Sequence, residues 1–397
     1  MRALAISAYT TTSCLGAGIE PARRALREGR TGLAACRFEE VELPTFVGEI
    51  AEVDAVPIPA ALAPFDCRNN RAAELGLAQD GFVDAVSRTA LRVGARRIGV
   101  FIGTSTAGIL QTELAYRRRD PANGALPADF DYRRTHNTWS AAEYVRARLG
   151  LSGPCAAIST ACSSSAKAFA SASRLIDAGL IDAAVVGGVD TLCLTTLYGF
   201  SSLELLSPQR CRPADAGRDG ISIGEGAAFF LVEPARDAGA LALLGAGESS
   251  DAHHMSSPHP EGEGARRAME AALAAAGVDA SSIDYVNLHG TGTPSNDAAE
   301  DIAVHGLFGD RVPVSSTKGM TGHALGAAGA VEAALCALAL EEGRIPSSVG
   351  TRTVDPGLRA SYAIEGRDAP LSFVMSNSFG FGGSNCSLVF GRLRHAA

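Results

Sequence analysis

One cysteine stands where a strand-like run gives way to a helix-like run. Cys162 lies in Ile158-Ser-Thr-Ala-Cys-Ser-Ser-Ser-Ala-Lys167, a polar turn between apolar residues and an alanine- and serine-rich stretch. Unpaired amides and aligned peptide dipoles at a helix start favour negative charge, so we expect a thiolate there near neutral pH. Such a turn also directs amides at one point, which suits a nucleophile and an oxyanion. The alternative of a small buried hydrophobe fits better the cysteines in apolar runs: Cys155, Cys193, Cys336 and Cys386.

Two histidines occupy glycine-marked segments far downstream. His289 follows the strand-like residues 285–288 and opens His-Gly-Thr-Gly-Thr-Pro, which predicts a side chain projected into a crevice. His323 ends Lys-Gly-Met-Thr-Gly-His before a helix-like run, where the helix dipole favours a neutral imidazole that can donate to an oxyanion. The alternative for each is a hydrogen-bonded structural histidine. A thiolate with two imidazoles is suited to acyl transfer through a thioester.

Three charged residues near these segments are candidates for supporting roles. Lys318 precedes His323 by five positions and Glu300 follows His289 by eleven, so we predict a buried Lys318–Glu300 pair that braces the site. A solvated surface charge is the alternative for either one. Glu332 interrupts an otherwise apolar helical run, and a buried carboxylate needs hydrogen-bonding partners or a cation.

Two further segments invite a ligand interpretation. His253, His254 and His259 cluster in a proline-marked loop, but their spacing matches no common zinc pattern. The glycine-rich residues 379–385 lack the GxGxxG spacing and precede no helix, which argues against a phosphate loop. We expect instead a mobile gate beside the crevice, with glycines permitting movement and Phe381 as the apolar door.

Short strand-like runs alternate with longer helical runs, which predicts a layered α/β fold. The strands are expected at 97–102, 183–189, 227–232 and 285–288, and the helices at 163–178, 263–276 and 324–342. Residues 159–182 and 317–345 share an order of reactive residue, small-residue helix and glycine. Two similar halves would bring Cys162 and His323 together at a pseudo-twofold axis. A seam at 234–239 divides the chain into residues 1–238, which carry the cysteine, and 239–397, which carry the histidines and Lys318.

Composition narrows the class of protein. The 397 residues carry a formal net charge of −8, which argues against generic nucleic-acid binding. Nine cysteines without CxxC pairs indicate reduced thiols in a cytoplasmic protein. We expect no secretory signal and no membrane span. Arginines nevertheless group in four places where an acidic partner can dock, namely 68 and 71, 117–119, 133–134, and 210 and 212.

Taken together, the motifs resemble those of the elongating β-ketoacyl-acyl-carrier-protein synthases of the thiolase superfamily. The resemblance covers essentially the whole chain, and it is carried by the segments that begin at Thr160, Asp251, His289, Ser316 and Asn377. It implies a five-layered αβαβα fold with two pseudo-symmetric halves. It also implies a decarboxylative condensation of an acyl chain, held on Cys162, with malonyl carried on acyl carrier protein, in fatty acid or polyene and polyketide biosynthesis. Neither a redox cofactor nor a catalytic metal is implied.

The resemblance also assigns roles to individual residues. Cys162 is the acyl acceptor, His289 and His323 drive malonyl decarboxylation, and Lys318 and Glu300 form a supporting ion pair. By the same resemblance, the amides of Cys162 and Phe381 form the oxyanion hole, and the gate consists of Phe381, Gly380 and Asp251. Phosphopantetheine is bound by Thr291, Thr293 and Ser256, and Thr106 lies in an acyl pocket that faces across a dimer. The carrier docks on Arg68, Arg71 and Arg212, and a structural monovalent cation is held by Asn287, Glu332, Ser376 and Asn377.

Several alternatives stay open. A degradative thiolase would need a second catalytic cysteine in a Cys-x-Gly setting, whereas Cys386 leads into a terminal strand. An initiating synthase would resemble a Cys-His-Asn set, but His323 occupies the third position. A non-catalytic chain-length subunit would lack Cys162, although the chain can be the active half of such a heterodimer rather than a homodimer. The segment 201–208 and the Asp251 loop are similar to the corresponding segments of the ketosynthases from bacterial aryl-polyene gene clusters.

Overall fold

The structure is a computed structural model that describes residues 1–235 and 238–393. In this part of the chain, one sheet of twelve strands runs through the molecule, with β2 (Gly16–Ala17) paired to β1 at its side. The other strands follow the order β14 (Ser361–Tyr362), β12 (Pro313–Ser315), β11 (Tyr285–Asn287), β16 (Phe373–Gly380), β17 (Ser384–Arg392), β10 (Leu241–Ser250), β1 (Leu4–Ser13), β9 (Gly226–Pro234), β7 (Ala183–Asp190), β5 (Ile98–Gly103) and β6 (Cys155–Ile158).

The sheet consists of two halves with the same internal order. In the first half, β5 is parallel to β6 and β7, β7 is antiparallel to β9, and β9 is antiparallel to β1. In the second half, β11 is parallel to β12 and β16, β16 is antiparallel to β17, and β17 is antiparallel to β10. The halves meet where β1 pairs with β10, with Leu4 opposite Leu243. This repeat confirms the predicted pseudo-symmetric fold.

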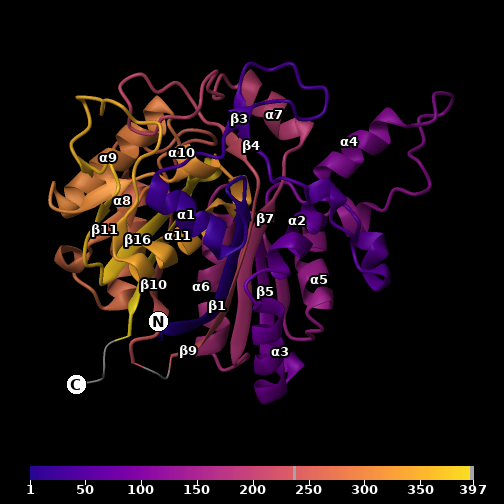
Figure 1. Cartoon of the computed structure of the whole chain (residues 1–397), viewed down its shortest axis with the longest axis horizontal. Helices are drawn as coiled ribbons and strands as arrows, with labels where there is room; N and C mark the ends of the chain where they lie inside the picture. The colour runs from indigo at the N-terminus through magenta and orange to yellow at the C-terminus, as the bar shows by residue number, and fades with distance from the viewer. Residues whose placement is uncertain (236–237, 394–397) are drawn as a thin grey trace.

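Helices complete five layers, as Figure 1 shows. Between the two half-sheets lie α6 (Ser164–Asp177) and α11 (Ala328–Glu342), which contact strands of both halves. The outer face of the first half carries α2 (Arg68–Leu77), α3 (Phe82–Val93) and α5 (Trp139–Arg148), and the second half carries α8 (Glu263–Ala276) and α9 (Pro294–Phe308). Another helix, α1 (Ile19–Glu28), packs on β1 and α11.

The two central helices approach each other through small residues. A Cβ atom at Gly329 of α11 would lie 2.8 Å from the amide nitrogen of Ala166 in α6, so only glycine permits this contact. Thirteen of the fifteen residues of α11 are buried, as expected for a helix that is apolar all round. The predicted small-residue helices therefore form the core layer that brings the two reactive turns together.

Predicted and observed elements agree closely, with one informative difference. The predicted strands correspond to β5, β7, β9 and β11, and the helix predicted at 263–276 is α8. The helix expected from residue 324 begins only at Ala328, after a 3₁₀ turn at Leu325–Ala327 and the short helix α10 (Lys318–Thr321). The predicted seam at 234–239 includes residues 236 and 237, which lie outside the described residues, so the division at 238 stays a prediction.

Smaller elements surround this frame. One small sheet joins β3 (Ala34–Ala35), β4 (Phe46–Gly48) and β8 (Ile223–Gly224), and another joins β13 (Arg344–Ile345) and β15 (Arg367–Asp368). The helix α7 (Leu194–Ser202) lies near β3 and β4, whereas α4 (Ile109–Arg117) and the segment after it project from the body (Figure 1). Among the described residues, every helix is too short or too polar to cross a membrane.

Candidate active site

Cys162 sits in a strained turn between β6 and α6. Ala161, the residue before it, has a φ of 53°, a left-handed conformation that costs about 1–3 kcal/mol outside glycine. The turn is held by its own hydroxyls, because Ser163 Oγ donates to the Thr160 carbonyl at 2.9 Å and Ser164 Oγ donates to the Ala161 carbonyl at 2.5 Å. The Cys162 thiol is consequently fixed at the wall of a cavity.

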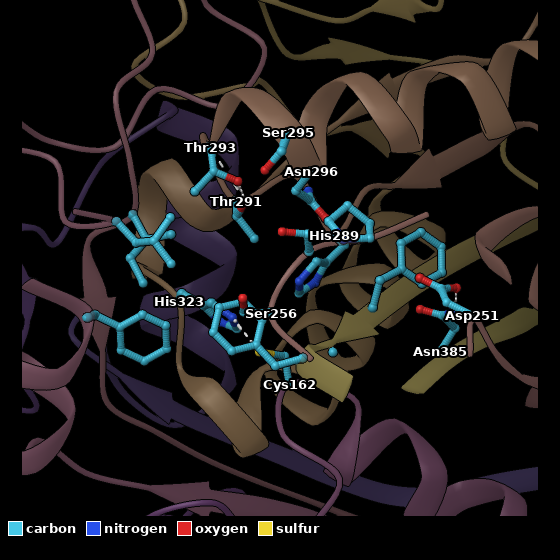
Figure 2. Close-up of a pocket in the computed structure, with 18 residues that line it drawn as sticks. Cys162, Asp251, Ser256, His289, Thr291, Thr293, Ser295, Asn296, His323 and Asn385 are labelled. Atoms are coloured by element: carbon cyan, nitrogen blue, oxygen red, sulfur yellow. Dashed lines mark hydrogen bonds between the residues drawn. The ribbon is translucent and has the colours of Figure 1, made fainter. Parts of the chain in front are cut away.

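Both histidines meet the cysteine in this cavity. His323 Nε2 lies 3.0 Å from Cys162 Sγ, and the rings of His289 and His323 lie 5.3 Å apart, nearly perpendicular to each other. Figure 2 shows the three side chains converging on one space, to which Thr291, Thr293 and Ser256 also point. The predicted convergence of one sulfur and two imidazoles is confirmed.

His323 is held by backbone rather than by a helix start. Its amide donates to the Ser222 carbonyl at 2.7 Å, and its carbonyl accepts from the Gly224 amide at 2.9 Å. A 3₁₀ turn begins at Leu325 and runs into α11 at Ala328, so the helix start lies two residues beyond His323, and the expected helix dipole is not among the main causes of its lowered pKa. The neutral state has another cause: burial, and then the charge of Lys318, hold the pKa of His323 well below its ordinary value.

Lys318 orients His289. The Lys318 ammonium donates to the His289 carbonyl at 2.5 Å and lies 3.3 Å from His289 Nδ1. An ammonium has only donors, so Nδ1 accepts and the ring proton is on Nε2, which faces the cavity. Burial, followed by the charges of Lys318 and His323, holds the pKa of His289 well below its ordinary value. His289 is therefore a neutral hydrogen-bond donor toward the cavity.

The predicted Lys318–Glu300 pair is wrong. Lys318 is fully buried and pairs with Glu332 of α11, whereas Glu300 accepts the amides of His289 at 2.8 Å and Gly290 at 2.7 Å. Glu300 is thus committed to shaping the His289 turn, and α11 presents the carboxylate that reaches the ammonium. Burial is the main cause that raises the pKa of each carboxyl, Glu300 and Glu332, to about 7.

The atoms beside Glu332 fit the implied monovalent cation in part. Glu332 Oε2 and Ser376 Oγ are buried without a hydrogen-bond partner in the described chain, and Asn287 lies opposite Ser376 in the β11–β16 pair. The side chain of Asn377 does not fit, because its amide donates to Glu300 at 3.2 Å and its oxygen accepts from Ser387 at 2.8 Å. Asn287, Glu332 and Ser376 would hold such an ion, which would offset the carboxylate charge.

The state of Cys162 also differs from the sequence-based expectation. Burial raises the pKa of its thiol to about 11, and the charge of Lys318 and the backbone amides of Phe381 and Cys162, which bond to the sulfur, act in the opposite direction. The closed cavity therefore favours the neutral thiol, because desolvation outweighs the amides. Those same two amides are the predicted oxyanion hole, and they point at the reacting sulfur.

Two loops close the cavity. Asp251 accepts from Asn385 Nδ2 at 2.6 Å (Figure 2). The Asp251 amide donates to the Gly383 carbonyl at 2.9 Å. Phe381 stacks obliquely on Phe200 with ring centroids 5.7 Å apart. The enclosed volume is about 60 Å³, whereas sites for drug-sized ligands span roughly 300–1,000 Å³. An extended substrate arm needs these loops to part, in keeping with the predicted gate at Phe381, Gly380 and Asp251.

Arg68 is not a docking residue. Its side chain is only 4% exposed and its guanidinium pairs with the fully buried Glu225, with Glu49 and with Asp54. This cluster anchors α2 to the segment between β8 and β9, so Arg68 stabilises the core rather than meeting a partner.

Other predicted positions lie outside the cavity. Arg71 is paired with Asp66 and Arg212 with Asp219, and both side chains are partly exposed, so their docking role stays a prediction. Thr106 is buried and its hydroxyl donates to Asp190 at 2.8 Å, away from the cavity lining. The cavity is also lined by Phe200, Leu205 and Ile221, which come from segments without a local sequence signal that predicts them.

The arrangement of the three reactive side chains also bears on metal binding. Their ligand atoms lie within 4.8 Å of one another, and they form the only cluster of this kind among the described histidines, cysteines and acids; His253, His254 and His259 do not form one. In zinc-bound histidines the N–H of the second ring nitrogen donates a hydrogen bond to an acceptor, but His289 Nδ1 faces the Lys318 ammonium, which has only donors. The site is therefore organised for hydrogen bonding to an oxygen.

Comparisons with known proteins agree with this chemistry. Residues 1–238 match the profile of the β-ketoacyl synthase N-terminal domain, and residues 241–352 match that of the C-terminal domain. The chain is 36% identical over 312 residues to a 3-oxoacyl-[acyl-carrier-protein] synthase 2 of Staphylococcus aureus, covering 75% of this chain and 77% of the relative. It is 38% identical over 350 residues to the same-named protein of Rhizobium meliloti, covering 83% and 81%.

Solved structures give the same result. A ketosynthase, ApeO, in complex with its chain length factor, ApeC, from Xenorhabdus doucetiae is similar with a TM-score of 0.90 and 37% identity, covering 98% of both chains. A β-ketoacyl synthase from Burkholderia phymatum is similar with a TM-score of 0.88 and 31% identity, covering 99% of this chain and 100% of the other.

Proposed function

The chain belongs to the β-ketoacyl synthase family, and we propose that Cys162, His289 and His323 carry out its reaction. It is a β-ketoacyl-acyl-carrier-protein synthase, an acyltransferase that condenses an acyl chain with malonyl-acyl carrier protein and releases carbon dioxide. The observation that carries the residue assignment is the contact of Cys162 Sγ with His323 Nε2 at 3.0 Å beside a second neutral imidazole.

Acyl transfer to Cys162 comes first. The sulfur attacks the carbonyl carbon of the acyl-carrier thioester, and the charge that develops on oxygen is held by the amides of Cys162 and Phe381. The carbon–sulfur bond to the carrier breaks, and the carrier sulfur takes the proton that Cys162 loses. His323 Nε2, 3.0 Å from the sulfur, keeps its proton for the next step and donates a hydrogen bond to the thiolate that forms.

Decarboxylation follows when malonyl-carrier replaces the first carrier. The Nε2–H groups of His289 and His323 donate to the malonyl thioester oxygen, so the negative charge left as carbon dioxide departs is held as an enolate. Neutral imidazoles suit this task because each keeps one donor and leaves no excess proton to quench the carbanion. The enolate carbon attacks the acyl carbonyl, a carbon–carbon bond forms, and the bond to Cys162 Sγ breaks.

The carrier arm enters through the gate. Thr291 and Thr293 have their hydroxyls 2.9 Å apart at the cavity wall, and Ser256 lies on the opposing loop. These hydroxyls offer hydrogen bonds to the amide groups of phosphopantetheine. We assign no cofactor to the reaction beyond this carried arm.

A second candidate concerns the partner of this subunit. One end of the sheet is formed by β6 (Cys155–Ile158), whose residues are only partly buried and whose outer edge has no strand beside it in the described chain. Such an edge pairs readily with another strand. The structural match to a ketosynthase solved with its chain length factor favours a heterodimer of that kind over two copies of this chain.

The test uses the separate half-reactions. Purified protein receives acyl carriers of graded length and unsaturation with malonyl-carrier, alone and with a candidate chain length factor. Cys162→Ala should abolish condensation and keep decarboxylation, and His323→Ala should abolish decarboxylation and keep some acyl loading. Cys193→Ala, a buried cysteine outside the cavity lining, is the control and should keep both. If His323→Ala keeps both half-reactions at the wild-type rate, the role of His323 is wrong.

A further inference from the structure

Asp190 is a buried acid that the reaction does not use. It is the last residue of β7, it is fully buried, and its carboxylate accepts from two separate loops. The donors and distances are Thr104 Oγ at 2.6 Å, the Ser105 amide at 2.9 Å, the Thr106 amide at 2.9 Å, Thr106 Oγ at 2.8 Å and the Gly326 amide at 2.6 Å.

This carboxylate has amide and hydroxyl partners only. In the described chain, no lysine or arginine lies within ion-pair distance of Asp190, in contrast to Glu332 and Glu225. Backbone amides are obligate donors, so the side chain between them must accept on both oxygens. A carboxylate at this position therefore joins loops that would otherwise present unpaired amides to each other.

The two loops lead to the two reactive residues. On one side, Ser105 Oγ donates to the carbonyl of Ala161, the neighbour of Cys162, at 3.4 Å. On the other side, Gly326 lies in the 3₁₀ turn three residues after His323, and its amide bonds directly to Asp190. Asp190 thus connects the cysteine turn of the first half with the histidine turn of the second half.

Both turns contain strained backbone. Ala161 has a φ of 53°, Leu325 has a φ of 48°, and Ala107, beside Thr106, has a φ of 42°. Residues other than glycine keep a positive φ only where several contacts of the surrounding structure hold the backbone in place. The Asp190 carboxylate bonds to Gly326, the neighbour of Leu325, and to Thr106, the neighbour of Ala107. These hydrogen bonds are therefore placed to stabilise the two strained conformations.

We propose that Asp190 is a positioning residue that sets the approach of the His323 imidazole to the Cys162 thiol; this rests on the proposed function. The link to the His323 turn is direct and short, at 2.6 Å, whereas the link to the cysteine turn passes through Ser105 and a longer 3.4 Å contact. Loss of the carboxylate should therefore impair the His323-dependent decarboxylation more than acyl transfer to Cys162.

The first variant is Asp190→Asn, which keeps the shape and turns an amide donor toward the backbone amides. We expect malonyl-carrier decarboxylation to fall by on the order of 10- to 100-fold and acyl transfer to fall by a clearly smaller factor. The matched control is Asp301→Asn. Asp301 is also buried and accepts the amides of Arg359 at 3.0 Å and Ala360 at 2.9 Å, outside the cavity lining. It should lose stability in urea and keep the wild-type ratio of the two rates.

The second variant disturbs the same contact from the other side. A Cβ at Gly326 would lie 2.8 Å from Asp190 Oδ2 and 2.7 Å from the Ser105 amide, so Gly326→Ala must push the two loops apart. It should change the rate ratio in the same direction, and its effect should be non-additive with Asp190→Asn because both act on one contact. Gly326→Ala also gives a result if Asp190→Asn does not fold.

Two outcomes are distinguishable. If an active wild-type enzyme and both variants have the same ratio of decarboxylation to acyl transfer, Asp190 only stabilises the fold and the inference is wrong. A wild-type protein that performs neither half-reaction with any carrier would instead refute the proposed function, and this inference with it.

Discussion

Lys318 and Glu332 form a buried ion pair whose energetics can be worked out from the structure. Their side chains are 0% and 3% exposed. In Lys318→Met, Glu332 loses the charge that lowers its pKa, so its folded-state pKa rises above the present value of about 7. A carboxyl raised from 4.5 to 7 or more costs at least about 3 kcal/mol once the pH exceeds the folded value, at 1.36 kcal/mol per pKa unit.

The sign of the pH dependence follows from the raised pKa. Protonated Glu332 adds no electrostatic cost below pH 4.5, because the carboxyl is protonated in both the folded and the unfolded protein. That stability is lost as the pH rises through the folded-state pKa of Glu332. Lys318→Met should therefore lose stability between pH 4.5 and 8, and the double variant Lys318→Met/Glu332→Gln should lose at least about 3 kcal/mol less. The single variant Glu332→Gln should lower the free energy of unfolding by about 3–5 kcal/mol, because the unpaired Lys318 ammonium stays buried.

Urea unfolding of the wild type, both single variants and the double variant at pH 5 and pH 8 measures these differences. Decarboxylation assays on the same samples should show loss of activity in all three variants, since Lys318 orients His289 and Glu332 holds the Lys318 ammonium in place. Equal stability of Lys318→Met and the double variant at both pH values would refute the reasoning.

The remaining predictions concern the cavity and its surroundings. Because the pKa of Cys162 is raised to about 11, its alkylation by iodoacetamide should accelerate about tenfold per pH unit from pH 7 to 9; a plateau below pH 8 in a mass-spectrometric time course would contradict this. Asn385→Ala removes the 2.6 Å bond to Asp251 and should accelerate the same alkylation at constant pH by opening the gate, so an unchanged rate counts against the closed-loop account. Arg68→Gln should destabilise the protein by about 3–5 kcal/mol without raising the KM for carrier in the folded fraction; an increase in KM alone would restore the docking role.

The reactive residues were predictable because each lies in a short segment with its own signal. Cys162 and His289 follow strand-like runs and enter turns marked by serine or glycine, so their positions depend mainly on local sequence. The small-residue runs behind Cys162 and His323 predicted two central helices, and Gly329 shows why those residues are small.

The pairing of charges was not predictable in the same way. Lys318 binds Glu332 rather than Glu300 because α11 passes beside the ammonium, and no spacing along the chain encodes that passage. In the sequence, Arg68 likewise has no feature that distinguishes it from a surface arginine, and only the structure shows that it pairs with the buried Glu225. Burial also decided the state of Cys162, since desolvation in a closed cavity outweighs the local amides that the sequence indicates.

The most direct test of the central claim is intact-protein and peptide mass spectrometry during a single turnover. The protein is first incubated with acyl-carrier and then chased with malonyl-carrier. We expect the acyl mass on the peptide that contains Cys162, and its loss during the chase in step with carbon dioxide release and formation of a β-ketoacyl carrier two carbons longer. Acylation at another residue, or carbon dioxide release while the acyl group stays on Cys162, would contradict the account.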